Sequence, residues 1–575
     1  MITKNWQIAE LINKDVLGSW PEIDPVLLQL LWNRNIRTQE AIDEFLNPDW
    51  SQDVHDPYLF RDMKKAVERI YEAVGAKQKI GIFGDYDADG VSAAVMLATT
   101  LKKLGAIPEV YLPHREREGY GINNEAIKYL ADKGVELLIT CDCGIANVSQ
   151  VAYANSLGLV LIITDHHQQQ AELPPAYAIL HCGLEDETYP FKYLSGGGVA
   201  FKLVQGLLRY EGCHLSKQEG EAWEKWLLDL VAISTVADMV RLVGENRTLA
   251  LYGLKVLCKT RRLGLRKIIE VAGLRFDNLG TYSIGFQIAP RINAAGRMDH
   301  ANAAYALLVS ENATEAEELA RALNLTNSER QKVTEEMLQT ARLQIGELKP
   351  EQYFVHAFEP SWQLGIVGLV AGKLVQEYNR PALAMCQIGD KICGSGRSGV
   401  GNFDLAAALK ECQEHLITWG GHKEAAGFSL GKDKLEEFLK AFTKIVKREL
   451  KGINLAPILN IDLPLKLNQV DWSLYEQVEK MEPIGQLNPT PKFVSYGLNV
   501  AGLIPVGSTG QHLRLVLEGD GLSRKFILFR QGDASTQFRI GDAVDVVYEV
   551  GVNEWNGNRE LELKLVDIKL SKDKE

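Results

Sequence analysis

An acidic cluster follows a short apolar run that ends at residue 84. Asp85, Asp87 and Asp89 place three carboxylates two residues apart, and the pair His166 and His167 follows a later apolar run. Several carboxylates with few imidazoles suit a hard or borderline divalent cation, Mn²⁺ or Mg²⁺, better than zinc, which prefers Cys and His. These residue types predict a metal site for chemistry on phosphates.

Two ions bridged by a shared Asp would fit such a site. A pair of divalent ions lowers the pKa of a bridging water and neutralises charge on the attacking and leaving oxygens of a phosphodiester. The favoured chemistry is therefore hydrolysis of a phosphoric ester or anhydride.

Two other interpretations of the acidic cluster are an EF-hand calcium loop and a solvated surface turn. The spacing matches the first half of a calcium loop, but position twelve would be Met96, where a bidentate Glu is required. The predicted flanks are a strand and a helix rather than two helices. Polar residues at the ends of further predicted strands also disfavour a plain surface turn.

Apolar runs alternate with helical segments through this part of the chain. Candidate strands begin near residues 79, 107, 135 and 159, and helical composition covers residues 91–104, 124–133 and 147–157. Repeated strand–helix units predict a doubly wound parallel sheet, with the carboxyl ends of its strands on one edge. We therefore expect Asp142, which follows the third run, to converge with the acidic cluster and the histidine pair.

Composition sets wider bounds. A chain of 575 residues should hold three or four domains. The polar N-terminus lacks the apolar core of a secretory signal, and no run of eighteen apolar residues predicts a membrane span, so we expect a cytoplasmic protein. Eight cysteines without paired Cys-x-x-Cys units disfavour zinc and disulfides. The net charge of −12 is mild evidence against nucleic-acid binding, although it does not exclude a basic channel between domains.

Several motifs in order resemble those of a known enzyme family. Asp85–Gly90, Asp142–Gly144, Asp165–His167 and Val236–Asp238 look like the four motifs of the DHH phosphoesterase superfamily. Further segments narrow the resemblance to RecJ-type single-strand-specific exonucleases: Tyr111–Arg115 with Glu118–Gly121, Pro290–Met298, Gly394–Ser398 and Gly420–Phe428. The resemblance covers nearly the whole chain.

The resemblance implies a set of metal ligands. Two ions, Mn²⁺ or Mg²⁺, would be held by Asp87, Asp89, Asp142, His166 and Asp238, with Asp142 as the bridge. His167 would face the scissile phosphate, and Asp85 would be a further ligand or a close neighbour of the ligands. Phe83 stands where the superfamily often has a His, so one ion is expected to have a thinner protein shell, completed by Asp85 or water.

The resemblance also implies the residues that bind the substrate. Arg115, Ser395 and Arg397 match a pocket for the 5′-phosphate of the strand, where a guanidinium can give two parallel hydrogen bonds to phosphate. His422 belongs to a neighbouring motif of the same pocket. Gln363 replaces a His that the family often has, which puts any role of that His in doubt.

A helical motif holds three more substrate-binding candidates. Arg291, Asn293 and Arg297 either approach substrate phosphates or brace the domain.

The expected architecture is multidomain α/β. It comprises a helical lead-in at 1–57, a parallel-sheet DHH domain at 58–300, a long linking helix at 301–345, a smaller α/β domain of DHHA1 type at 346–454 and an OB-like β-barrel at 455–575. Short alternating strands at 512–517, 525–529 and 543–550 carry the barrel prediction, and such barrels commonly bind single strands.

The expected function is that of a single-stranded-DNA-specific 5′ to 3′ exonuclease that releases 5′-mononucleotides by a two-metal mechanism in DNA repair and recombination. The alternatives are a DHH-type phosphodiesterase of short oligonucleotides and a catalytically inactive nucleic-acid scaffold. Expected partners are single-stranded DNA with a 5′ end and, from the family resemblance, a single-strand-binding protein and a helicase. The enzyme is expected to act as a monomer without a membrane partner.

Overall fold

The structure is a computed structural model that describes residues 4–349, 351–401, 403–507, 509–529, 536–555 and 557–571. The chain divides into two compact units. One comprises Val54–Val240 and Thr248–Leu455, and the other comprises Met1–Asp53, Arg241–Arg247 and Ala456–Glu575.

The first sheet of the larger unit consists of five parallel strands in the order β3–β2–β4–β5–β6. The strands are β2 (Ile80–Gly84), β3 (Glu109–Tyr111), β4 (Leu137–Cys141), β5 (Val160–Thr164) and β6 (Ala178–Leu180). The chain leaves β2 toward β3 and then crosses back to β4 on the other side of β2. This reversal makes the carboxyl ends of β2 and β4 a topological switch point, where ligands of such sheets bind.

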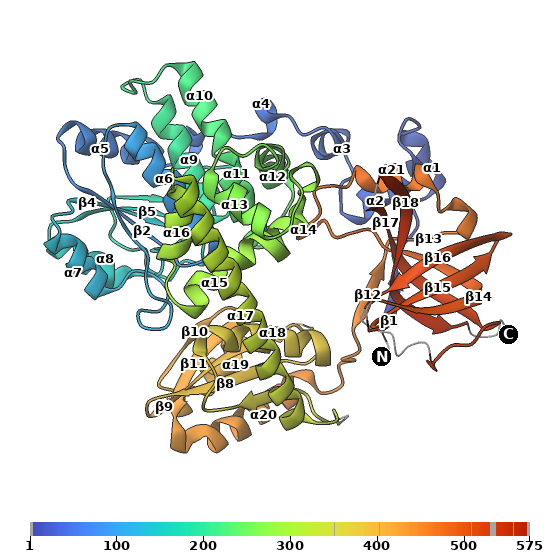
Figure 1. Cartoon of the computed structure of the whole chain (residues 1–575). Coiled ribbons are helices and arrows are strands. Elements are labelled where there is room, and N and C mark those ends of the chain that lie inside the picture. Colours follow the sequence, from blue (N-terminus) through green and yellow to red (C-terminus); the bar gives the residue numbers. More distant parts are fainter. Residues whose placement is uncertain are drawn as a thin grey trace. The chain divides into compact units, whose positions relative to one another are not determined.

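Helices cover both faces of this sheet (Figure 1). On one face lie α7 (Asn124–Asp132) and α8 (Val148–Ser156), and on the other lie α5 (Met63–Gly75), α6 (Ala88–Lys103) and α9 (Gly196–Arg209). Helix α6 is apolar on nearly all sides because it packs on the sheet, on α9 and on α11 (Leu228–Ala237). That burial fixes the helix whose first turn carries Asp89.

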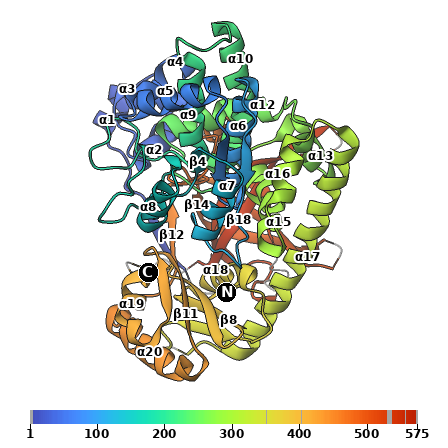
Figure 2. The same cartoon turned by 90° about the vertical axis from the view of Figure 1, so that its left-hand side faces the viewer.

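A layer of further helices extends this domain. These are α10 (Lys217–Trp226), α12 (Gly244–Leu257), α13 (Leu263–Val271), α14 (Thr281–Ser283), the π-helical turn η3 (Ile284–Ile288), α15 (Ala289–Met298) and α16 (Asn302–Val309). The long helix α17 (Ala313–Ile345) packs on α13, α15 and α16 near its start and on the next domain near its end (Figure 2).

The second domain of the larger unit has a mixed sheet in the order β10–β11–β9–β8–β7. Its elements are β7 (Val355–Phe358), α18 (Leu364–Tyr378), β8 (Ala382–Ile388), β9 (Lys391–Arg397), α19 (Leu405–Glu411), β10 (Thr418–Gly421), β11 (Ala425–Gly431) and α20 (Leu435–Leu450). Strands β8 and β9 form a hairpin, which places Ser395 and Arg397 in an interior strand of the sheet.

The smaller unit contains a closed barrel. Strands β14 (Phe493–Val506), β15 (His512–Gly519), β16 (Leu522–Leu528), β18 (Asn558–Leu570) and β17 (Ala543–Trp555) pair in that order, and β17 pairs back to β14. All pairs are antiparallel except β16 with β18, which are parallel. Strand β13 (Leu463–Pro464) and helix α21 (Trp472–Glu479) precede the barrel.

The expected helical lead-in needs a correction. Helices α1 (Lys14–Ser19), α2 (Pro25–Asn33), α3 (Gln39–Leu46) and α4 (Trp50–Asp53) are present, but β1 (Asn5–Ile8) precedes them. Strand β1 pairs in parallel with β12 (Ile458–Ile461), a partner about 450 residues away that local sequence does not reveal. Apolar side chains of α2 and α3 share a core with the barrel, so the lead-in folds with the C-terminal part.

The predicted fold class is confirmed, with a parallel α/β domain, a linking helix, a smaller α/β domain and an OB-like barrel. No helix among the described residues is both long enough and apolar enough to span a bilayer.

Two helical glycines are expected to differ in how a substitution by alanine changes stability, because Gly264 is tightly packed between α13 and α16 and Gly372 is not. A Cβ at Gly264 would lie 2.0 Å from the carbonyl oxygen of Leu307, so Gly264→Ala should destabilise the larger unit by about 1–3 kcal/mol, the usual cost of overpacking. Gly372 in α18 faces open space, so Gly372→Ala should be neutral or stabilise by up to about 1 kcal/mol. Urea unfolding would measure both, and equal midpoints would contradict this packing.

Candidate active site

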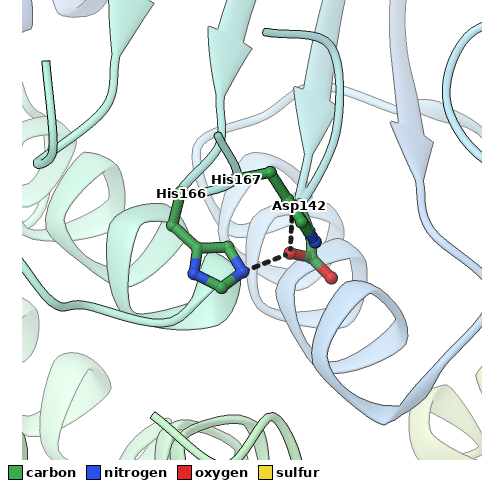
Figure 3. A group of neighbouring side chains, drawn as sticks. All are labelled: Asp142, His166 and His167. Carbon is green, nitrogen blue, oxygen red and sulfur yellow. Dashed lines mark ion pairs between the residues drawn. The ribbon is translucent and has the colours of Figure 1, made fainter. Parts of the chain in front are cut away.

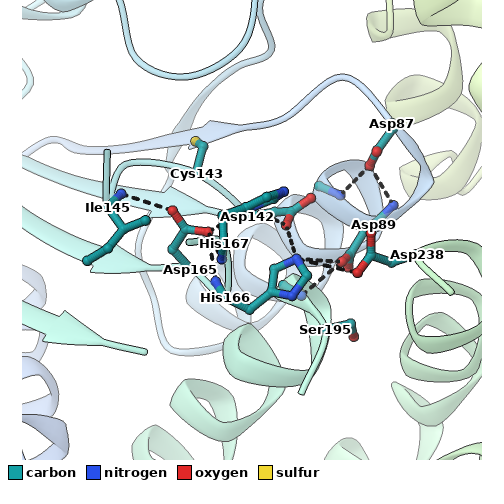
Figure 4. Close-up of polar contacts among 12 residues, drawn as sticks. Asp87, Asp89, Asp142, Cys143, Ile145, Asp165, His166, His167, Ser195 and Asp238 are labelled. Carbon is teal, nitrogen blue, oxygen red and sulfur yellow. Dashed lines mark hydrogen bonds and ion pairs between the residues drawn. The ribbon is translucent and has the colours of Figure 1, made fainter. Parts of the chain in front are cut away.

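Four residues from different elements meet at the carboxyl ends of the strands. His166 Nε2, just after β5, lies 3.1 Å from Asp142 Oδ1, 3.4 Å from Asp238 Oδ2 and 3.8 Å from Asp89 Oδ2. Asp142 follows β4, Asp89 lies in the first turn of α6 and Asp238 ends α11. The convergence expected from the parallel sheet is therefore present. Figure 3 shows Asp142 with His166 and His167, and Figure 4 shows Asp89 and Asp238 beside His166.

The turn between β2 and α6 is built around Asp87. Its Oδ1 accepts hydrogen bonds from the backbone N–H groups of Asp89, at 2.9 Å, and Gly90, at 3.1 Å, and so caps the helix. A Cβ at Gly90 would lie 2.6 Å from the backbone nitrogen of Asp85, so only glycine fits beneath this turn. The tight turn brings Asp85 and Asp87 to within reach of Asp142, with carboxylate oxygens no more than 4.8 Å apart.

Asp89 is held by groups that the sequence did not indicate. Its carboxylate accepts from the backbone N–H groups of Gly196, at 2.8 Å, and Gly197, at 2.7 Å, and from the Ser234 hydroxyl. The two amides start α9, where N–H groups have no partner within the helix. The run of three glycines after Ser195 was the available signal for this close approach.

Asp142 has a backbone conformation that favours glycine. Its φ is 63°, and non-glycine residues rarely adopt this left-handed region outside turns and functional sites. Its amide donates to the carbonyl of Thr164 on the neighbouring strand, at 2.9 Å. The unusual conformation aims the carboxylate at both His166 and His167, whose ring nitrogens lie 3.1 and 3.7 Å from Asp142 Oδ1.

The electrostatics of the cluster show a deficit of positive charge. Burial and neighbouring carboxylates raise the pKa of Asp85, Asp142 and Asp238 well above the usual range, and the same causes raise the pKa of Asp89 to about 6. Close carboxylates in a dry site repel one another unless a proton or a cation intervenes.

The donor set fits divalent ions. Asp85 Oδ1, Asp142 Oδ1 and His166 Nε2 are buried, and none has a hydrogen-bond partner within the described part of the chain. Burial, followed by the charge of His167, lowers the pKa of His166 to about 3, so the imidazole is neutral, as a metal ligand must be.

The atoms that could hold a metal ion form three groups of three. Each brings three donor atoms to within 4.8 Å of one another: Asp142, His166 and His167; Asp89, His166 and Asp238; and Asp85, Asp87 and Asp142. Shared Asp142 and His166 link these triads. Oxygen-rich sites of this kind suit Mn²⁺ or Mg²⁺.

His167 is oriented by two further residues. Its Nδ1 lies 2.9 Å from Asp165 Oδ1 and 2.8 Å from the Tyr120 hydroxyl, which donates to the carbonyl of Asp142. Asp165 is fixed in turn by the amide of Ile145 and by the amides of both histidines. Burial opposes a charge on the ring, but the hydrogen bond to Asp165 and the negative charges of Asp165, Asp238 and Asp85 together outweigh burial and raise the pKa of His167 to about 9. The ring therefore presents a positively charged Nε2 beside the cluster.

Three arginines form a second cluster beside the carboxylates. Burial lowers the pKa of Arg397 and lowers that of Arg297 to about 9, and in both cases the charge of Arg115 adds to the effect. Arg397 donates to the Ser395 hydroxyl, at 2.9 Å, and Arg115 stacks over the ring of Tyr86. These cations lie close together without a carboxylate that pairs with them in the described salt bridges, which favours binding of an anion.

Other predicted substrate contacts have partners within the protein. Arg291 donates to Asn324 on α17 and to the carbonyl of Gln287, which corresponds to the bracing alternative. Asn293 accepts from the amide of Ala88, at 2.7 Å, and so supports the start of α6.

His422 lies in the second domain and meets the first. Its Nδ1 contacts the side-chain oxygen of Gln168, two residues after His166, at 3.0 Å. The contact places residues 420–428 beside the segment that follows β5 and carries His166 and His167.

Phe83 and Gln363, which stand where the family often has His, do not belong to the metal-site cluster. Phe83 is fully buried and stacks on Tyr111 in an apolar core, and exposed Gln363 precedes α18. The residues that could hold a metal ion therefore include no histidine from β2.

Gly196→Ala is expected to weaken metal binding. Its Cβ would lie 2.3 Å from Asp142 Oδ1, so the carboxylate must move, and loss of such support typically costs 10- to 100-fold in metal affinity. Gly198→Ala is the matched control, because the nearest atom to its Cβ is 3.2 Å away and belongs to Leu194. Calorimetric titration with Mn²⁺ would compare the two, and equal affinities would contradict the packing of Gly196 on Asp142.

Comparison with known families matches each part of the chain. The family model for the DHH family, N-terminal domain, matches residues 79–235, the DHHA1 domain matches residues 351–448, and the RecJ OB domain matches residues 461–567.

Named relatives extend the match along the chain. The chain is 35% identical to the single-stranded-DNA-specific exonuclease RecJ of Bacillus subtilis, over 96% of this chain and 68% of the relative, and 31% identical to that of Escherichia coli, over 95% and 96%. The crystal structure of RecJ in complex with Mn²⁺ from Thermus thermophilus superposes with a TM-score of 0.83 at 27% identity, covering 99% of this chain and 80% of that one. The chain therefore belongs to the RecJ family of DHH phosphoesterases.

Proposed function

We propose that this chain is a single-stranded-DNA-specific exonuclease that hydrolyses phosphodiester bonds in the 5′ to 3′ direction and depends on two divalent ions, Mn²⁺ or Mg²⁺. The observation that carries the proposal is the adjacency of two clusters of opposite charge. Arg297 belongs to the arginine cluster and is close enough to Asp87 for their charges to interact. The end of a strand can thus place its terminal phosphate at the arginines and the next phosphate at the metal ions that the carboxylates would hold.

The carboxylate cluster is the proposed metal site. Asp87, Asp89, Asp142, His166 and Asp238 would hold the two ions, with Asp142 shared between them and Asp85 as a further ligand or a close neighbour of the ligands. The bound ions would lower the pKa of an attacking water and neutralise the charge that develops on the departing oxygen. His167, held by Asp165 and Tyr120, points its charged Nε2 toward the scissile phosphate.

The arginine cluster is the proposed pocket for the 5′-phosphate. Arg115 and Arg397 provide planar donors that match a phosphate, and Ser395 adds a hydroxyl beside them. Anchoring the terminal phosphate there sets the first internucleotide phosphate at the metal site, so the product is a 5′-mononucleotide. In this proposal His422 and Arg297, at the end of α15, complete the wall of the phosphate pocket.

The third part of the proposal concerns the barrel. OB-type barrels bind single strands on a surface that need not read base identity. A match of residues 461–567 to the RecJ OB domain supports a substrate longer than a dinucleotide.

Two alternatives remain distinct from this proposal. A phosphodiesterase of short oligonucleotides would not need the barrel, and an inactive scaffold would not need six intact metal-site residues. The cytoplasmic location, the monomeric state, the roles in repair and recombination, and the single-strand-binding protein and helicase partners stay predictions.

Asp142→Ala should abolish cleavage while leaving some DNA binding, because it removes the shared ligand and not the strand-binding surface. The test follows shortening of a 3′-labelled, 5′-phosphorylated single strand with Mn²⁺ present or chelated, beside the matching duplex. Asp132→Ala, on the exposed face of α7, is the control. Near-normal cleavage by Asp142→Ala would reject the two-metal site, and metal-dependent cleavage of dinucleotides alone would favour the small-substrate phosphodiesterase.

Arg397→Ala should weaken the preference for a phosphorylated 5′ end by about 1.5–3 kcal/mol, the usual worth of a hydrogen bond to a charged group. The measurement is kcat/KM on strands with a 5′-phosphate and a 5′-hydroxyl. Arg448→Ala provides the control, because that exposed arginine lies in the same domain and pairs with Glu411. An equal loss on both strands would place Arg397 outside the phosphate pocket.

A further inference from the structure

One residue in the first turn of α18 bonds to two separate segments of the first domain. The amide of Gly365 donates to Glu116 Oε1 at 2.9 Å, and the carbonyl of Gly365 accepts from Arg297 Nη1 at 3.3 Å. Glu116 directly follows Arg115 in the chain. Both segments therefore carry an arginine of the cluster, and both are tied to the second domain through Gly365.

The same helix packs against the side of the pocket that the second domain supplies. A Cβ at Gly368, three residues after Gly365, would lie 3.1 Å from Arg397 Nη2 and 3.3 Å from Ser395 Oγ. A Cβ at Gly365 would lie 2.3 Å from the carbonyl oxygen of Arg297. Residues three apart share one face of a helix. This glycine face lets the segments from both domains approach the start of α18 closely.

The turn that carries Arg115 and Glu116 is closed by its own hydrogen bonds. The amide of Glu118 donates to the carbonyl of His114 at 2.9 Å, and the Glu118 carboxylate accepts from the amide of His114 at 2.6 Å. The same carboxylate accepts from the Tyr111 hydroxyl, at the end of β3, at 2.7 Å. Because the turn is closed in this way, a displacement of Glu116 would also displace Arg115.

The negative charge of Glu116 does not explain its place. A carboxylate near a pocket for an anion weakens anion binding, so charge alone disfavours an acidic residue next to Arg115. A carboxylate at the start of a helix is favourable, because the N–H groups there have no partner within the helix and carry a partial positive charge. The bond to α18 therefore gives Glu116 a role that its charge alone would not.

We propose that Glu116 is a positioning residue that holds the two sides of the 5′-phosphate pocket at a fixed separation. The proposal rests on the proposed function. Arg115 and Arg297 belong to the first-domain side of the pocket, and Ser395 and Arg397 belong to the second-domain side. A phosphate can bond to both sides at once only at a suitable separation, because hydrogen bonds weaken steeply with distance and angle. Glu116 itself touches neither the phosphate nor the metal ions.

The test measures the preference for a phosphorylated 5′ end, which is the ratio of kcat/KM on strands with a 5′-phosphate and a 5′-hydroxyl. In Glu116→Ala the preference should fall by about 5- to 50-fold, because the arginines of the two domains are no longer held in one geometry. The value of kcat/KM on the 5′-hydroxyl strand should change little. If Glu116 acted only through its charge, the preference would rise instead, and that result would overturn the proposal.

Two further variants separate position from charge. Glu116→Gln keeps an oxygen that can accept from the Gly365 amide, so it should keep most of the preference. A loss as large as that of Glu116→Ala would show that the hydrogen bond is not what matters. Glu311→Ala removes an exposed carboxylate from the same domain and should leave kcat/KM on both strands unchanged.

A double-mutant cycle tests whether Glu116 acts through the pocket. Arg397→Ala already removes one side of the pocket, so adding Glu116→Ala should lower the preference by less than Glu116→Ala does alone. Losses that simply multiply would place Glu116 outside the pocket and contradict the positioning role. Both strands are measured on one preparation of each variant, so any unfolded fraction cancels from the ratio.

The outcomes distinguish the two proposals. If the unaltered protein prefers a 5′-phosphate and Glu116→Ala keeps that preference, the positioning role is overturned and the proposed function stands. If the unaltered protein cleaves single strands without such a preference, the phosphate pocket fails and the positioning role fails with it. If it does not cleave single strands at all, the proposed function and the positioning role both fail.

Discussion

The structure depends on the cost of gathering carboxylates in a buried place. Asp85, Asp89 and Asp142 are almost fully inaccessible, so burial raises the cost of ionising each of them, and the charge of Asp87 adds to that cost in all three cases. Only part of that cost is offset by the protein itself, through the helix-start amides that hold Asp89. In the described part of the chain, Asp85 Oδ1, Asp142 Oδ1 and His166 Nε2 are buried without a hydrogen-bond partner, and bound cations would satisfy them. The carboxylates at this edge of the sheet are therefore only partly neutralised by the protein, and they favour binding of cations.

The neighbouring arginines have the opposite charge and favour binding of an anion. Burial lowers the pKa of Arg297 and of Arg397, and in both cases the charge of Arg115 adds to the effect. Neither cluster neutralises the other completely, although Asp87 and Arg297 interact. Metal ions on one side and phosphates on the other would satisfy both clusters at once. A net charge of −12 is thus compatible with a phosphate-binding site, because the local arrangement of charge decides binding.

Two domains of the larger unit contribute to this arrangement. The carboxylates come from the parallel sheet and its helices, whereas Ser395 and Arg397 come from the second sheet. Contacts across the two domains are direct: Glu116 accepts from the amide of Gly365 at the start of α18, and Arg297 donates to the Gly365 carbonyl. Helix α17 packs on both domains and so ties one sheet to the other.

The sequence by itself determined the strands β2, β3, β4 and β5, because short apolar runs followed by polar residues are local patterns. It also determined that side chains after these strands converge, because parallel sheets align their carboxyl ends. Asp142 and His166 could be placed beside Asp89 on that rule alone.

Tertiary structure decided which groups support those residues. The amides of Gly196 and Gly197 on Asp89, the Tyr120 hydroxyl on His167, the bracing role of Arg291 and the pairing of β1 with β12 all join residues through packing. Such contacts depend on how helices and strands pack after the chain has folded, and no local pattern encodes them.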